Sequence, residues 1–239
     1  MKRIIKLYGR LMKHRFSVLL IAQAVMLIVL PLLRSLFPSE ETGFLAKLAA
    51  ILFLLILLSA LFAVGRTRAT IVISTGLLLS GITADVLHAA LQLKHAAVVG
   101  NAVDILFLGW CTVLIVSRIF KVKTVSFDII AASLCAYLLM ALAWGVLYVL
   151  IERVHPGSFL CASIPSEQLI RDGTLSVYFS FVILSTLGLG DILPATSSVR
   201  MLVGSEAIMG QIYLAVLVAR LVGMHITNRH TDGTEGESK

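Results

Sequence analysis

The strongest candidate for chemistry in this chain is a short run that contains two glycines separated by one residue. The run reads Thr186-Leu187-Gly188-Leu189-Gly190-Asp191. A protein can hold a cation stripped of its water with backbone carbonyl oxygens. Successive carbonyls point the same way when alternate residues adopt left-handed or otherwise unusual backbone geometry, which glycine adopts cheaply. The spacing therefore fits cation coordination by carbonyls, while a plain turn between two apolar segments is the alternative.

Other residues that carry chemistry show no usable pattern. The six histidines are scattered, and Cys111, Cys135 and Cys161 lack the spacing of a metal site. Glycine-rich phosphate loops and plausible Ser-His-Asp arrangements are also missing. We therefore expect no catalytic residues, no enzymatic activity and no cofactor. No second cysteine of the chain is expected on the same side of the membrane as Cys161, so this residue is a free thiol or forms a disulfide between subunits.

The composition places these residues in a membrane protein. Of the 239 residues, 59% are hydrophobic and 14% are charged, whereas a soluble globule needs more polar surface. Six apolar runs are long enough to cross the hydrocarbon core as helices, which takes about 20 residues. They are residues 17–37, 44–64, 69–91, 98–120, 127–151 and about 198–224. The sequence thus predicts an all-α membrane protein with six transmembrane helices.

One further apolar segment is too short to span. Residues 174–185 follow a polar stretch and directly precede the glycine run. A half-length apolar helix between two full spans is typical of a re-entrant helix, because irregular backbone at membrane depth is tolerated where it lines a cavity. The glycine run would then follow a re-entrant helix between the fifth and sixth spans.

The basic residues orient the spans. The chain has 20 lysines and arginines against 13 acidic residues, a net charge of +7, and 14 of the 20 fall on one side of the predicted spans. The positive-inside bias makes that side cytoplasmic. The sequence therefore predicts a multi-pass protein of the cell (plasma or inner) membrane, with both termini cytoplasmic and the glycine run on the outer side. We expect no nucleic-acid partner, and no soluble ligand is indicated.

In this context, the run at 186–191 resembles the selectivity filter of tetrameric potassium channels, whose usual form is Thr-Val-Gly-Tyr-Gly-Asp after a pore helix. The resemblance extends over about residues 127–223. It implies a bacterial-type subunit with six transmembrane helices and one re-entrant pore helix, assembled as a homotetramer in the lipid bilayer. It also implies K+ as the permeant ion, bound at the filter carbonyls, with Asp191 at the outer mouth.

The resemblance assigns further roles along the chain. Tyr178 and Phe179 correspond to the aromatic part of the pore helix that supports the filter. Gly210 falls where the family often carries a hinge glycine, and Gln211 is a candidate to line the cavity. The implied segments are a basic N-terminus (1–16), a four-helix peripheral domain (17–120), a pore domain (121–224) and a short cytoplasmic tail (225–239).

Two departures from the family pattern matter for function. Leu189 replaces the usual tyrosine and cannot donate its hydrogen bond, so we expect packing against Tyr178 and Phe179 to hold the outer filter. In the fourth span, residues 98–120 carry a single arginine, Arg118, whereas gating charge must cross the membrane field. The peripheral domain thus resembles a voltage sensor without gating arginines, and we expect shallow voltage dependence.

Four charges fall within the outer halves of the first four spans: Arg34, Lys47, Asp85 and Asp104. Charges inside a membrane are expensive and are candidates for function. Mutual neutralisation or snorkelling is one interpretation. The other is a sensor, in which His88, one turn from Asp85, adds a proton near neutral pH.

Three polar or aromatic residues of the predicted pore domain remain open. Trp144 and Tyr148 near the outer end of the fifth span are expected to pack or to anchor at the interface. Glu206 in the last span could pair with Arg200, brace the filter, or form a simple polar contact between helices.

The best overall interpretation is a potassium channel subunit that conducts K+ passively and senses voltage little or not at all. A weakly selective cation channel, with a filter relaxed by Leu189, is the first alternative. A secondary transporter or a membrane assembly protein without transport is the second. Transporters usually show paired interruptions in two repeated halves, and this chain has a single interruption.

Overall fold

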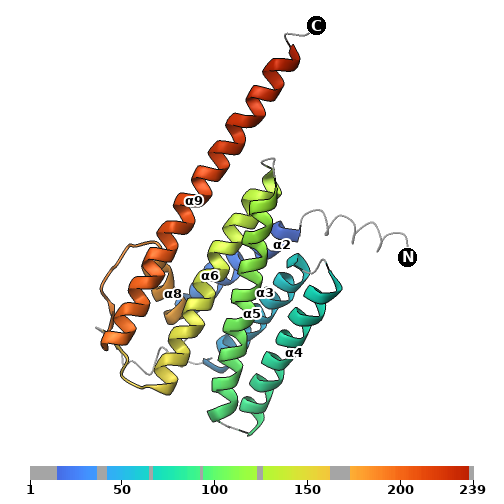
Figure 1. Cartoon of the computed structure of the whole chain (residues 1–239). Helices are drawn as coiled ribbons and strands as arrows, with labels where there is room; N and C mark the ends of the chain where they lie inside the picture. Colours follow the sequence, from blue (N-terminus) through green and yellow to red (C-terminus); the bar gives the residue numbers. More distant parts are fainter. Residues whose placement is uncertain are drawn as a thin grey trace.

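A computed structural model describes residues 15–36, 42–64, 67–91, 94–122, 126–161 and 173–236, which are almost entirely helical (Figure 1). The long helices are α2 (Arg15–Leu36), α3 (Thr42–Val64), α4 (Arg68–Leu91), α5 (Lys94–Lys121), α6 (Phe127–Val154) and α9 (Ser197–Gly236). A short helix, α8 (Gly173–Leu184), precedes the glycine run. Two short strands are β1 (Phe159–Cys161) and β2 (Ile192–Pro194).

Helix α6 joins the two parts of the molecule. On one side it packs against α5 and α2, which together with α3 and α4 form a four-helix bundle; on another it packs against α8 and α9 (Figure 1). Buried apolar side chains such as Phe107 and Ile115 of α5 and Leu139 of α6 form the core between bundle and α6. The contacts of α6 therefore connect the four-helix bundle to α8 and α9.

The helices have the length and surface of membrane spans. Over the described residues, α2, α4, α5, α6 and α9 each contain a segment long and apolar enough to cross a membrane, while the corresponding segment of α3, Leu48–Val64, is shorter. Large apolar side chains face outward, including Ile28 (65% exposed), Val72 (69%) and Leu106 (61%). These features support a multi-pass, mainly helical membrane protein.

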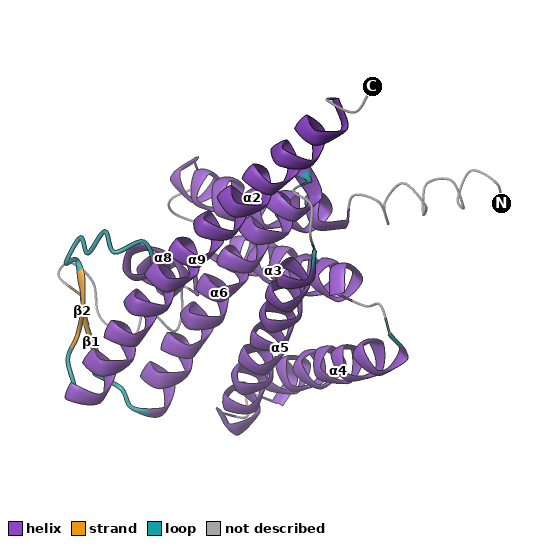
Figure 2. Cartoon of the chain, turned by 45° about the horizontal axis from the view of Figure 1, so that its top comes forward, coloured by secondary structure: helices purple, strands orange, loops and turns teal. Residues whose placement is uncertain are grey.

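The structure differs from the predicted secondary structure in two places. Strands β1 and β2 pair as an antiparallel ribbon in which Leu160 lies opposite Leu193 (Figure 2). Each strand has three residues, too few to show the alternation that identifies a strand in a sequence. Helix α9 also continues to Gly236, beyond the predicted end of the last span at Met224. The apolar run marks where a hydrocarbon segment can end, not where the helix ends.

Candidate functional site

The backbone of the glycine run alternates in conformation. Thr186 has φ 58°, Gly188 has φ 58° and Gly190 has φ 79°. Positive φ at every second residue is the geometry that lets successive carbonyls face one side. The sequence predicted it at the two glycines. The sequence did not indicate a positive φ at Thr186, because L residues with a side chain seldom adopt one.

Backbone hydrogen bonds fix how α8 ends and the run begins. The carbonyl of Val182 accepts hydrogen bonds from the amides of Leu187 (2.9 Å) and Gly188 (3.4 Å), and the carbonyl of Ile183 accepts one from Thr186 (2.8 Å). These bonds satisfy carbonyls that a helix end otherwise leaves free. The C-terminal end of α8 thus points its partial negative charge at the start of the run, which favours a cation there.

The packing of Leu189 against Tyr178 and Phe179 stays a prediction, because in one subunit the side chain of Leu189 is largely exposed. Leu189 is 58% exposed, while Phe179 is 1% exposed and packs against Tyr148 and Phe159. Tyr178 instead contacts Asp191. Consecutive helical residues point about 100° apart, which agrees with the different partners of Tyr178 and Phe179.

Asp191 is tied to α8 by a hydrogen bond. The phenol of Tyr178 donates to Asp191 Oδ2 at 2.8 Å, and the amide of Ile192 donates to Asp191 Oδ1 at 3.1 Å. Both bonds lie at the end of the glycine run. The Tyr178 hydroxyl therefore fixes this end of the run by a hydrogen bond of a kind that the side chain of Leu189 cannot make.

An aromatic cluster holds α8 against α6. The ring of Tyr148 in α6 lies 5.2 Å from that of Phe179 in α8 and 5.3 Å from that of Phe159 in β1, between ring centroids. A Cβ placed on Gly145 would come within 2.9 Å of the Cα of Val177, so α6 and α8 meet at backbone contact. Tyr148 is fully buried, which shows a packing role rather than an interfacial one.

Glu206 joins three helices through one carboxylate. It is fully buried and accepts hydrogen bonds from the phenol of Tyr148 in α6 and the hydroxyl of Ser180 in α8. Arg200 does not pair with it, because its Nε donates to the carbonyl of Pro194 at 3.2 Å. Of the alternatives that the sequence left open for Glu206, the structure shows the polar contact between helices, while the Nε of Arg200 bonds elsewhere.

Helix α9 reaches the glycine run directly. The side-chain amide of Gln211 donates to the hydroxyl of Thr186 at 3.2 Å. Gly210 lies against the end of α8, where a Cβ would overlap the carbonyl of Leu184. Helix α9 is continuous through Gly210, so the glycine serves a close approach between α9 and α8 in this conformation. The sequence gave no indication of that contact.

At the opposite end of the molecule, Arg220 of α9 caps α5. Its Nε donates to the carbonyl of Ile119 (3.2 Å), and its Nη2 donates to the carbonyls of Phe120 (2.6 Å) and Val122 (2.8 Å). The guanidinium also lies 5.0 Å from the centre of the Phe120 ring. A cation at a helix C-terminus complements the dipole and the free carbonyls. Arg220 therefore joins α9 to the four-helix bundle, a contact that sequence reasoning missed.

The predicted neutralisation of the membrane charges by Arg34 and Lys47 stays a prediction. Arg34 and Lys47 lie in α2 and α3, but their side chains fall outside the described part. Among described residues, Asp85 has Arg153 and His88 within electrostatic reach, whereas the charged neighbour of Asp104 is Asp85, a second anion. Arg153 follows the predicted fifth span and was not considered as a partner.

Comparison with known proteins agrees with the arrangement around α8. Residues 136–226 match a protein family model described as an ion channel. The match covers most of α6, all of α8 and the glycine run, and α9 as far as Ile226. No curated protein and no solved structure matches the chain significantly.

The family match and the apolar helices together support an ion channel domain in a multi-pass membrane protein. Such a domain supports passive conduction of ions and assembly in a lipid bilayer. Families of this kind are generally not enzymes.

Proposed function

We propose that the protein is the subunit of a homotetrameric channel that conducts K+ passively through the carbonyls of residues 186–191. The observation that carries the proposal is the alternation of positive φ at Thr186, Gly188 and Gly190 directly after a half-length helix. Rings of backbone carbonyls can replace the hydration shell of K+. One chain supplies one strand of such a ring, so several copies must surround the pore.

The exposure of the glycine run supports assembly. Leu187 is 64% exposed and Leu189 is 58% exposed, which is unfavourable for leucines that have no apolar cover. In a tetramer, equivalent loops from neighbouring subunits would surround one axis. Cover for these leucines then comes from the neighbouring subunits.

Little voltage dependence is part of the proposal. Within α5 the single arginine is Arg118, and its guanidinium lies 5.1 Å from the centre of the Phe16 ring near the end of the bundle. Such a charge cannot move through the field without losing its cation–π contact. We place the gate at the filter or in the inner helices beyond Gly210. The protein would lie in a cell membrane with both termini on the cytoplasmic side.

A second candidate is a weakly selective cation channel. It is favoured by Leu189, which makes no polar contact with the pore helix and leaves the Tyr178–Asp191 hydrogen bond to hold the outer end of the run. A filter held at one point deforms more easily than one held at two.

Flux through the purified protein tests both candidates. In liposomes loaded with K+, the protein should release K+ in a manner blocked by barium, and Gly188→Ala should abolish release because alanine disfavours positive φ. Gly204→Ala, in open space on α9, is the matched control. Reversal potentials that show Na+ permeating nearly as well as K+ would replace the selective channel by the weakly selective one. No flux with either ion, from correctly folded protein, would contradict both.

A further inference from the structure

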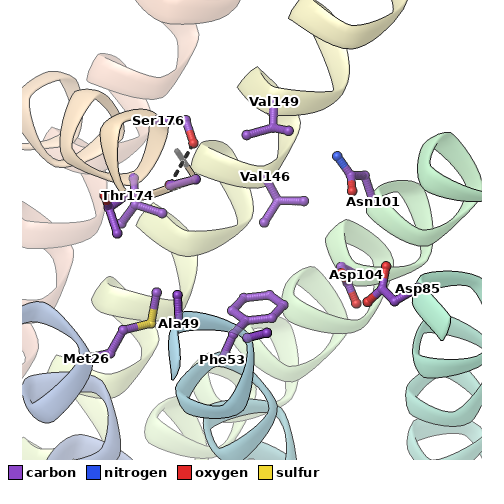
Figure 3. A pocket seen from close by; sticks show the side chains of 13 residues that line it. Met26, Ala49, Phe53, Asp85, Asn101, Asp104, Val146, Val149, Thr174 and Ser176 are labelled. Atoms are coloured by element: carbon purple, nitrogen blue, oxygen red, sulfur yellow. Dashed lines mark hydrogen bonds between the residues drawn. The ribbon is translucent and has the colours of Figure 1, made fainter. Parts of the chain in front are cut away.

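A cavity of about 290 Å³ lies where the four-helix bundle meets the pore helix (Figure 3). Its walls come from α2 to α6 and from the start of α8. Most of the wall is apolar, with Met26, Phe53 and Val149 among its residues. Its polar groups include two carboxylates and one amide, so the cavity has the mixed character of a small-molecule site.

One of these carboxylates is buried without compensation. Asp104 is 7% exposed, and no hydrogen bond or ion pair to it is found among the described residues. Figure 3 shows the carboxylates of Asp104 and Asp85 side by side at the edge of the cavity. A buried charge that faces a like charge is costly unless something positive joins it. The pair therefore calls for a proton or a cation.

The position of the two carboxylates is fixed by the helices. A Cβ on Gly100 would come within 2.7 Å of Asp85 Oδ1, and a Cβ on Gly81 would come within 3.0 Å of Asp104 Oδ1. Each aspartate thus occupies space left by a glycine on the facing helix. The segments 81–85 and 100–104 both read Gly-x-x-x-Asp and interlock reciprocally. The arrangement is preformed.

A donor in the same cavity also lacks a partner. The side-chain nitrogen of Asn101, one turn before Asp104 in α5, is buried and has no hydrogen-bond acceptor. Leaving a buried donor unpaired costs free energy. Among the described residues, Arg153 and His88 act electrostatically on Asp85, and Asp85 acts on Asp104. An occupant that satisfies the cavity would bring a positive charge and an acceptor oxygen.

We propose that this cavity binds a small organic ammonium with an apolar body and an acceptor oxygen. The ammonium would lie at Asp85 and Asp104, the oxygen would accept from Asn101, and the apolar body would pack on Met26, Phe53 and Val149. A bare metal ion would use the carboxylates and leave the apolar walls and the amide unsatisfied. The wall of the cavity also includes Gly173 and Val177 of α8, so an occupant touches the pore helix. Occupancy of the cavity should therefore also alter conduction, an expectation that rests on the proposed function.

Binding is tested on the full chain in lipid nanodiscs by calorimetry, without reference to conduction. The probe is 2-phenoxyethylammonium, and its neutral control is 2-phenoxyethanol, in which a hydroxyl replaces the ammonium. We expect saturable binding of the first compound alone. Asp104→Asn should weaken it at least about tenfold, equivalent to about 1.4 kcal/mol. Asp128→Asn, which removes a carboxylate in the first turn of α6, should leave the affinity unchanged.

A second variant tests the site independently, in case Asp104→Asn fails to fold. Ala49→Leu places a larger apolar side chain on the cavity wall, keeps both carboxylates and should also abolish binding. Equal binding of the two compounds, or full affinity in Asp104→Asn or in Ala49→Leu, would overturn the proposal. Binding of calcium chloride at the carboxylates with no binding of the ammonium would overturn it as well. Ammonium binding by a protein that conducts no ion would uphold the site and refute the proposed function.

Discussion

The phenol of Tyr148 in α6 donates a hydrogen bond to the carboxylate of Glu206 in α9, across 58 positions of the chain. The same carboxylate accepts a hydrogen bond from Ser180 in α8. Helix α8 is therefore held between the two long helices by one buried carboxyl group. If the inner helix moved away from α8, both bonds would break, so this contact favours the conformation described here.

Tyr148→Phe tests the strength of that contact. The change removes one of two donors from a buried carboxylate and keeps the ring that packs on Phe179. We expect the free energy of unfolding to fall by about 1–3 kcal/mol, the cost of an unsatisfied buried acceptor. Denaturant unfolding of the purified protein measures it. Tyr137→Phe, whose ring lies 5.9 Å from that of Tyr213, is the control, and an equal loss there would refute the role of the Glu206 bond.

Gly210→Ala tests whether this glycine serves close packing. Alanine is intrinsically better than glycine in a helix by about 1 kcal/mol, but a Cβ at 210 would overlap the Leu184 carbonyl. We expect net destabilisation and altered flux, because α9 must move away from the end of α8. Gly204→Ala, on the same helix with nothing within 4 Å of its Cβ, should be neutral or stabilising in the same unfolding assay. Equal behaviour of the two variants would leave a hinge as the better explanation of Gly210.

The sequence predicted the helices and the glycine run because both depend on local chemistry. Apolar runs of span length and a Gly-x-Gly after a half-length helix are visible without partners. Contacts between distant segments were less accessible. Gln211 was identified as a cavity residue, but its bond to Thr186 joins positions 25 apart, and nothing in either residue type indicates it.

Charge partners were the least predictable part of the site. A count of charges by depth grouped the two aspartates with Arg34 and Lys47, whose side chains lie outside the described part, and it did not indicate that Arg153 and His88 act on Asp85. Depth in a membrane does not fix the direction of a side chain around its helix. One local signal was present and overlooked: the repeat of Gly-x-x-x-Asp at 81–85 and 100–104, which marks helices that approach closely.

Gln211→Leu tests the link between the inner helix and the start of the glycine run. Leucine keeps the approximate volume and removes the donor to the Thr186 hydroxyl. We expect the K+ flux or its sensitivity to barium to change by several fold, with little change in unfolding, since both groups are exposed in one subunit. Ser205→Ala, whose hydroxyl bonds within α9 to Met201, is the control. Unchanged flux and block in Gln211→Leu would show that the bond does not influence conduction.

Arg220→Lys tests the cap on α5. Lysine keeps the charge but cannot present the planar set of donors that reaches the carbonyls of Ile119, Phe120 and Val122 together. We expect a loss of about 1 kcal/mol in the free energy of unfolding, as for one or two hydrogen bonds. Arg200→Lys removes one hydrogen bond to the carbonyl of Pro194 and should lower the free energy of unfolding by less. The reverse order would show that the α5–α9 contact does not stabilise the fold.

The thiol of Cys161 provides a test of the surroundings of β1 that depends on pH. Burial raises the pKa of Cys161, and the carboxylates of Glu152 and Asp191 raise it further. A raised pKa lowers the thiolate fraction at any given pH, and the thiolate is the reactive form. Alkylation by iodoacetamide, followed by mass of the Cys161 peptide, should therefore reach half its maximal rate above about pH 8.5, the usual range. The detergent-denatured chain should show the ordinary value, and Asp191→Asn should move the native midpoint toward it. A native midpoint at or below that of the denatured chain would place Cys161 in a different environment from the one described.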